Sequence, residues 1–105
     1  MGEPWIGIDL DGVLAEYHGF TTPIDIGVPI PSMLARVKQM IRGGKLVKIF
    51  TARAANPRAV KAIREWLVDN GLPPLDVTDR KDHDLIEFFD DRARRVETNT
   101  GRLLD

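Results

Sequence analysis

The feature that most restricts the fold is an apolar run that ends in two acids and a glycine, residues 5–14 (WIGIDLDGVL). Such a run is typical of a buried strand, and Gly12 allows a sharp turn after it because glycine accepts positive φ at little cost. Side chains alternate along a strand, so we expect Asp9 and Asp11 on the same side. Two like charges this close require a cation, a shared proton or a chemical role. The stretch therefore predicts a ligand site at the carboxyl end of a buried strand.

Composition restricts the classes of protein that remain. At 105 residues the chain is long enough for one core and too short for a sizeable second lobe, so we expect a single domain over 1–105. It has no cysteine, which excludes disulfides and thiolate metal sites. The formal net charge of −1 gives no reason to expect nucleic acid or an anionic membrane as partner. There is no signal-peptide pattern and no apolar run near the ~20 residues of a membrane span, so we expect a cytoplasmic protein.

The rest of the chain alternates between helical and extended patterns. A long loop over 15–31, rich in glycine and proline, precedes the first predicted helix, which begins at Pro31 and Ser32 and ends at Gly43-Gly44. A second helix is predicted from Asn56-Pro57 to Asn70-Gly71. The predicted strands after the first are 45–50, 75–77 and 85–89, with a small edge strand over 93–96 and a turn or short helix over 99–104. This alternation predicts a mainly parallel sheet with right-handed crossovers.

Polar side chains follow the predicted strands where they end. Thr51 follows the second strand, Asp90 and Asp91 follow a later one, and Lys81 lies in the polar run between. Parallel strands share one carboxyl edge, so we expect these side chains to meet the two acids of the first stretch there. Carboxylates suit Mg²⁺, whereas a hydroxyl and an ammonium suit phosphate oxygens. The set predicts a phosphoryl group held beside Mg²⁺.

On these residues the sequence resembles the haloacid dehalogenase (HAD) superfamily of phosphohydrolases. Its four motifs are an Asp-x-Asp-Gly after an apolar strand, a strand-end Ser or Thr, a Lys, and a strand-end acidic pair. They match residues 9–12, Thr51, Lys81 and residues 90–91, in that order. The resemblance implies a Mg²⁺-dependent phosphatase that hydrolyses a phosphate monoester through an aspartyl-phosphate. It also implies a three-layer Rossmann-like α/β domain, here of the small type without a cap domain because neither insertion point holds a long enough segment.

The resemblance assigns roles to the acids. Asp9 would be the nucleophile, and Asp11 would be the general acid toward the leaving oxygen and then the base toward water. Mg²⁺ would be bound by the Asp9 carboxylate, the Asp11 backbone carbonyl and one acid of the last pair. Asp91 is favoured as the direct ligand, with Asp90 in the outer shell or bound through water.

The remaining polar residues leave alternatives open. The resemblance assigns Thr51 and Lys81 to phosphate oxygens, with Arg80 as a substitute for Lys81. Thr51 could instead be a capping hydroxyl, and the run around Lys81 has the composition of a solvated loop. Arg53 and Arg92 follow predicted strands that end at the site, and each could contact a substrate phosphate or form an ion pair with a nearby acid.

The sequence restricts the substrate and the partners less than it restricts the site residues. An open site suits a macromolecular phosphate or a small phosphate ester enclosed by a partner subunit, which leaves a homo-oligomer open. Two other functions are a receiver-like phosphoacceptor and a non-catalytic, phosphate-binding HAD-like protein. Receiver domains have a different pattern: two adjacent acids follow the first strand, and the phosphoacceptor Asp lies alone on a later strand. Here the acids are spaced by one and Thr51 follows the second strand.

Overall fold

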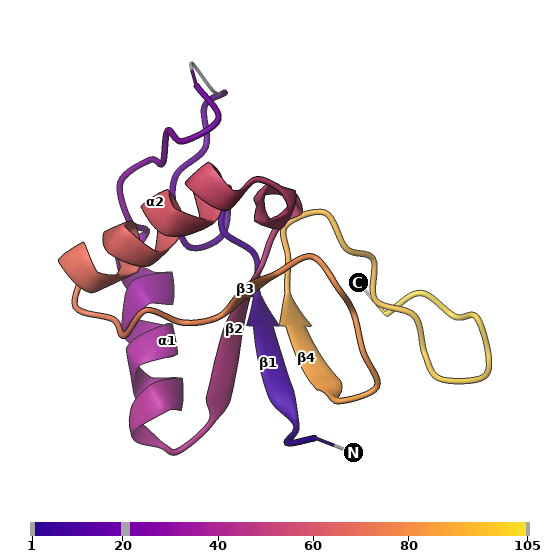
Figure 1. Cartoon of the computed structure of the whole chain (residues 1–105). Coiled ribbons are helices and arrows are strands. Elements are labelled where there is room, and N and C mark those ends of the chain that lie inside the picture. The colour runs from indigo at the N-terminus through magenta and orange to yellow at the C-terminus, as the bar shows by residue number, and fades with distance from the viewer. Residues whose placement is uncertain (1, 20–21, 105) are drawn as a thin grey trace.

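The computed structural model of the chain describes residues 2–19 and 22–104. Its four strands form one all-parallel sheet in the order β3-β2-β1-β4, so all four carboxyl ends lie along one edge (Figure 1). The elements in chain order are β1 (Trp5–Ile8), α1 (Pro31–Arg42), β2 (Leu46–Phe50), the 3₁₀ helix η1 (Ala52–Ala55), α2 (Pro57–Asp69), β3 (Val77–Thr78) and β4 (Leu85–Phe89). This α/β arrangement is compatible with a Rossmann-like fold.

The helices begin and end where the sequence predicts. Each has proline in its first turn, where the missing N–H costs no intrahelical hydrogen bond. The Oδ1 of Asn56 accepts hydrogen bonds from the backbone N–H groups of Arg58 (3.0 Å) and Ala59 (3.4 Å), which confirms the predicted cap of α2. No helix within residues 2–19 and 22–104 is long and apolar enough to cross a membrane.

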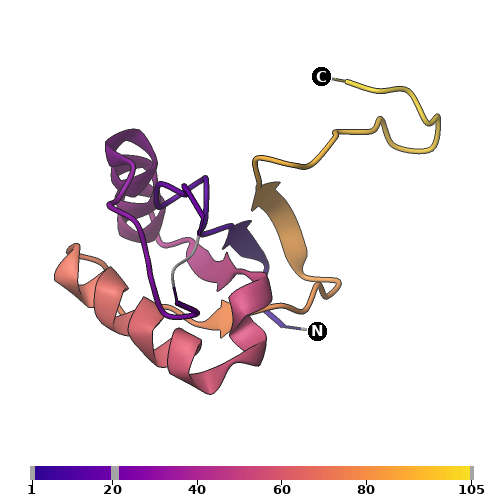
Figure 2. The ribbon, with the colours of Figure 1, turned by 90° about the horizontal axis from the view of Figure 1, so that it is seen from above.

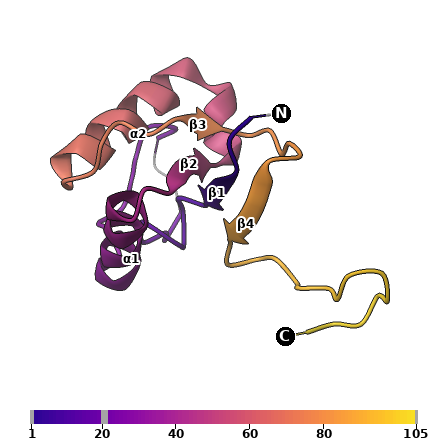
Figure 3. The ribbon, with the colours of Figure 1, turned by 90° about the horizontal axis from the view of Figure 1, so that it is seen from below.

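Both helices pack against the same face of the sheet (Figures 2 and 3). The strands β1, β2 and β3 are added in one direction, so two right-handed crossovers place α1 and α2 on one side. The core between these layers includes Ile6, Ile8, Val47 and Ile49 from the sheet and Val37, Ile63 and Leu67 from the helices. In the part of the chain that the structure describes, no helix covers the opposite face. The predicted third layer is therefore not confirmed.

The opposite face carries an aromatic group in place of a helix. The rings of Trp5 and Phe50 are stacked with their centroids 6.4 Å apart, and Phe88 meets Phe50 edge to face at 4.8 Å. The β3–β4 loop contributes Asp82, whose Oδ1 accepts a hydrogen bond from Trp5 Nε1 (2.8 Å). Gly7 lies among these rings, because a Cβ there would come within 3.2 Å of the Phe88 ring.

Smaller elements differ from the predictions. The short strand predicted over 75–77 is β3, Val77–Thr78. The edge strand predicted over 93–96 is not formed; Val96 makes only an isolated antiparallel bridge to Leu103, and the segment between them turns. The ends of the long loop pair as a hairpin would, with Glu16 N–H donating to the Val28 carbonyl (2.9 Å). Its residues 20 and 21 lie outside the described residues.

Candidate active site

A cavity of about 310 Å³ opens at the carboxyl edge of the sheet. Its walls come from the segments that follow β1, β2 and β4, so residues from three separate parts of the chain meet there. The four motifs contribute six polar side chains, and five of them line the cavity: Asp9, Asp11, Thr51, Asp90 and Asp91. The other lining residues are Tyr17, Phe50, Ala52, Arg53 and Arg92. The expected convergence at this edge is therefore observed for the acids and the hydroxyl.

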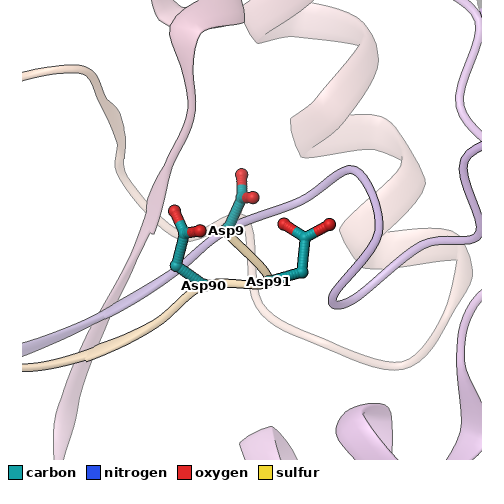
Figure 4. A group of neighbouring side chains, drawn as sticks. All are labelled: Asp9, Asp90 and Asp91. Carbon is teal, nitrogen blue, oxygen red and sulfur yellow. The ribbon is translucent and has the colours of Figure 1, made fainter. Parts of the chain in front are cut away.

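Three of the acids form a tight group. Carboxylate oxygens of Asp9, Asp90 and Asp91 all lie within 4.8 Å of one another, and the three side chains point to the same side of their two chain segments (Figure 4). Ligand oxygens on one Mg²⁺ are about 3 to 4 Å apart, given bonds of roughly 2.1 Å. Small side-chain rotations would bring the three oxygens to that spacing, so the donor set fits a hard divalent cation.

The environment of Asp9 favours its protonated form. Burial raises the pKa of Asp9 to about 6, and the nearby negative charges of Asp90, Asp91 and Asp11 contribute to the same rise. The hydrogen bond that the Leu10 N–H donates to Asp9 Oδ1 (2.8 Å) acts in the opposite direction. A carboxyl group crowded in this way gains from any bound cation that offsets the repulsion.

Gly12 is required where the first motif meets the last. Its φ is +86°, a conformation that side chains rarely adopt, and a Cβ there would lie 2.6 Å from Oδ2 of Asp91. Glycine thus provides both the turn after Asp11 and the space for Asp91. The sequence predicts the turn, but the close approach of Asp91 is visible only in three dimensions.

Thr51 is buried, and its hydroxyl has a local partner. The Arg53 N–H donates to Thr51 Oγ1 (3.2 Å), which makes Thr51 the cap of η1. The capping role considered for this residue is therefore present, and the same side chain also lines the cavity. The hydrogen of the hydroxyl is not used by that bond, so it can still be donated to an oxygen in the cavity.

Arg53 forms a two-point ion pair with Asp11. Its Nε donates to Asp11 Oδ2 (3.0 Å) and its Nη2 to Oδ1 (2.9 Å), and only 9% and 17% of the two side chains are exposed. Its Nη1 also donates to the Pro23 carbonyl (3.2 Å), which ties the long loop to the site. Of the two roles left open for Arg53, the ion pair with an acid is the one observed.

Lys81 is not brought to the cavity. It is exposed in the loop 79–84, and neither it nor Arg80 is among the lining residues. Arg92 does line the cavity, and its backbone N–H donates to Asp90 Oδ1 (2.6 Å). The cationic side chains at the cavity wall are thus Arg53 and Arg92.

The side chains of Tyr17 and Phe50 and the carbonyl of Pro23 also lie at the site, and none of them belongs to the four motifs. Tyr17 belongs to the long loop 15–31, whereas Phe50 has the pattern of an ordinary strand residue. The Pro23 carbonyl carries no sequence signal, since any residue would supply one.

No protein-family model, no curated protein and no solved structure matches this chain.

Proposed function

We propose that the protein is a Mg²⁺-dependent phosphatase that hydrolyses a phosphate monoester through an aspartyl-phosphate on Asp9. The observation that carries the proposal is the group formed by Asp9, Asp90 and Asp91 at the carboxyl edge of a parallel sheet, in a cavity that Thr51 and Asp11 also line. Open α/β sheets bind their ligands at this edge. The proposed reaction is the one that the resemblance to the HAD superfamily implies, and the positions of these five side chains are consistent with that reaction.

Asp9 is the proposed nucleophile. Its carboxylate oxygen attacks phosphorus, and the bond from phosphorus to the ester oxygen breaks as Asp11 gives that oxygen a proton. In the second step Asp11 takes a proton from water while the water oxygen attacks phosphorus. The bond from phosphorus to Asp9 then breaks, which releases inorganic phosphate and restores the Asp9 carboxylate.

The metal would be held by Asp9 and the pair that follows β4. The carboxylates of Asp9, Asp90 and Asp91 are close enough for one ion, with Asp91 favoured as the direct ligand and the Asp11 backbone carbonyl as a further one. A bound Mg²⁺ would neutralise part of the charge on these acids and on the phosphate oxygens.

Thr51 and Lys81 are proposed to hold the phosphate oxygens. Lys81 lies three residues beyond the carboxyl end of β3, whose last residue Thr78 accepts a hydrogen bond from the Thr51 N–H (2.9 Å). Three residues span at most about 10 Å, and the lysine side chain adds several more. The ammonium of Lys81 can therefore turn toward the site when a dianion is bound.

The proposed class is a small HAD-like core without a cap. Among the described residues, Tyr17 of the long loop lines the cavity, and the Pro23 carbonyl of the same loop accepts a hydrogen bond from Arg53. An open site of this kind admits either a small phosphate ester or an exposed phosphate on a macromolecule.

The proposal is tested by assaying the full chain for release of phosphate from an aryl phosphate, with and without Mg²⁺. We expect hydrolysis that requires Mg²⁺ and is lost in Asp9→Asn. Asp69→Asn is a matched control, because Asp69 is an exposed acid at the end of α2. Hydrolysis that persists in Asp9→Asn would remove Asp9 from the role of nucleophile.

A further inference from the structure

Residues 93–104 form an arm that stands away from the rest of the molecule. It leaves the carboxyl end of β4 and extends beyond the open edge of the sheet (Figures 2 and 3). The arm folds on itself as a small hairpin, in which the Glu97 N–H donates to the Arg102 carbonyl (2.7 Å) and the Leu104 N–H to the Arg95 carbonyl (2.9 Å). An isolated two-stranded hairpin is marginally stable in water.

The arm presents apolar side chains to solvent. Val96 and Leu103, which face each other in the hairpin bridge, are 53% and 52% exposed. Leu104 next to them is also exposed. An extended segment with three exposed aliphatic side chains gains stability if another surface covers them.

A surface of matching character lies on β4. This strand pairs only with β1 and forms the edge of the sheet, so the backbone groups along its outer side have no strand partner among the described residues. Ile86 is 65% exposed, and Phe88 is exposed as well. An edge strand with exposed apolar residues can accept an added strand through backbone hydrogen bonds.

The charges of the two segments are opposite. Residues 82–89 contain three acids and no Lys or Arg, whereas the arm contains three arginines and one glutamate. Glu87 is exposed in the middle of β4, and Arg94 is exposed near the start of the arm. Attraction between the segments would direct the arm to β4 and set its position along the strand.

We propose that the arm of one copy of this chain docks on the outer edge of β4 of a second copy, and the reverse, in a two-fold dimer. Each chain carries one arm and one outer side of β4 that has no strand partner among the described residues, and a reciprocal exchange covers both with a closed symmetry. The arm cannot cover its own β4 in the observed conformation because it extends away from that strand. The proposal is independent of the proposed phosphatase activity.

The first test is sedimentation equilibrium of the full chain over a range of concentrations. We expect a dimer that dissociates on dilution and as salt screens the charges. Val96→Asp should give a monomer, whereas Val68→Asp should not, since Val68 is a comparably exposed valine (54%) on α2. A chain that is monomeric at every concentration, or a dimer that Val96→Asp leaves intact, would overturn the proposal.

The second test is a charge exchange that keeps the arm apolar. Arg94→Glu should weaken the dimer at least tenfold, Glu87→Arg should do the same, and the double variant should recover most of the loss. Circular dichroism of each variant checks that the fold is retained. If the double variant is as weak as the single ones, Arg94 and Glu87 do not meet across the dimer and the proposed arrangement is wrong.

Discussion

Arg53 holds both carboxylate oxygens of Asp11, at 3.0 Å from Nε and 2.9 Å from Nη2, in a pair that is largely shielded from solvent. The pair joins the segment after β1 to the segment after β2. It also fixes the plane of the carboxylate that, in our proposal, exchanges a proton with the ester oxygen and then with water. A planar guanidinium can do this at two points, whereas an ammonium cannot.

Replacing Arg53 should therefore lower turnover more than substrate binding. We expect Arg53→Gln to reduce kcat by roughly 10- to 100-fold with KM changed little, since general acid–base catalysis contributes about 10²–10⁴. Arg53→Lys should recover little, because it restores charge without the two-point geometry. Steady-state kinetics with Arg58→Gln, an exposed arginine of α2, as control checks this. A large rise in KM at constant kcat would show instead that Arg53 binds the substrate phosphate.

Gly12 couples two motifs through space, so a methyl group there should weaken metal binding. We expect Gly12→Ala to lower Mg²⁺ affinity at least tenfold, because a Cβ would lie 2.6 Å from Asp91 Oδ2. The positive φ adds a destabilisation of about 1–3 kcal/mol. Gly44→Ala is the matched control: its φ is +80°, and nothing lies within 4 Å of its added Cβ. Calorimetric titration of both variants with Mg²⁺ separates the backbone strain, which both share, from the clash with Asp91, which only Gly12→Ala has. Equal Mg²⁺ affinities of the two variants would contradict the role of Asp91 as a metal ligand.

The raised pKa of Asp9 predicts how stability depends on pH without metal. The pKa is about 6 in the folded chain, against 3.8 for an aspartate in water, so the folded state holds the proton more tightly between these values. Stability contributed by protonated Asp9 is therefore lost as pH rises from about 4 to about 6. Mg²⁺ should restore stability above pH 6 and have little effect near pH 4.

Thermal unfolding across this pH range measures that dependence. Asp9→Asn should flatten the metal-free profile, raise the metal-free Tm at pH 7 and abolish the gain from Mg²⁺. The exposed Asp69→Asn should leave all three unchanged. A wild-type Tm at pH 7 that does not respond to Mg²⁺ would argue against the proposed metal site.

Lys81 and Arg80 are neighbours that can be compared directly. We expect Lys81→Ala to lower kcat/KM by roughly 10- to 100-fold, because a charge-assisted hydrogen bond to the phosphate contributes about 1.5–3 kcal/mol. Arg80→Ala should change it less than threefold. Arg92→Ala belongs in the same series, since Arg92 lines the cavity in the observed structure. If Arg92→Ala costs more than Lys81→Ala, the phosphate cation is Arg92.

Sequence alone predicts the larger elements because local signals and packing agree there. The helices are defined by the proline in the first turn of each, by the Asn56 cap of α2 and by the glycines that follow them, and the apolar run before Asp9 defines β1. The short β3 is displaced because two residues of pairing carry little local signal. The third layer is not formed in the described part of the chain because only the polar segment 79–84 lies between β3 and β4, which is too short for a crossover helix.

The site is predicted where it depends on strand ends and only in part where it depends on contacts across space. The positions of Asp9, Thr51 and the pair that follows β4 follow from the parallel sheet. The choice of Arg53 as the partner of Asp11, and the approach of Asp91 to Gly12, depend on the path of the loops. Such contacts join residues more than forty positions apart, and no local pattern encodes them.

The most direct test of the central claim is to trap the covalent intermediate. The full chain is mixed with Mg²⁺ and an aryl phosphate, quenched in acid within milliseconds, reduced with borohydride and mapped by peptide mass spectrometry. Our account predicts that the acyl phosphate forms on Asp9 alone, decays at the rate of turnover and is absent in Asp9→Asn. Turnover without any adduct, or an adduct on Asp11, Asp90 or Asp91, would contradict it.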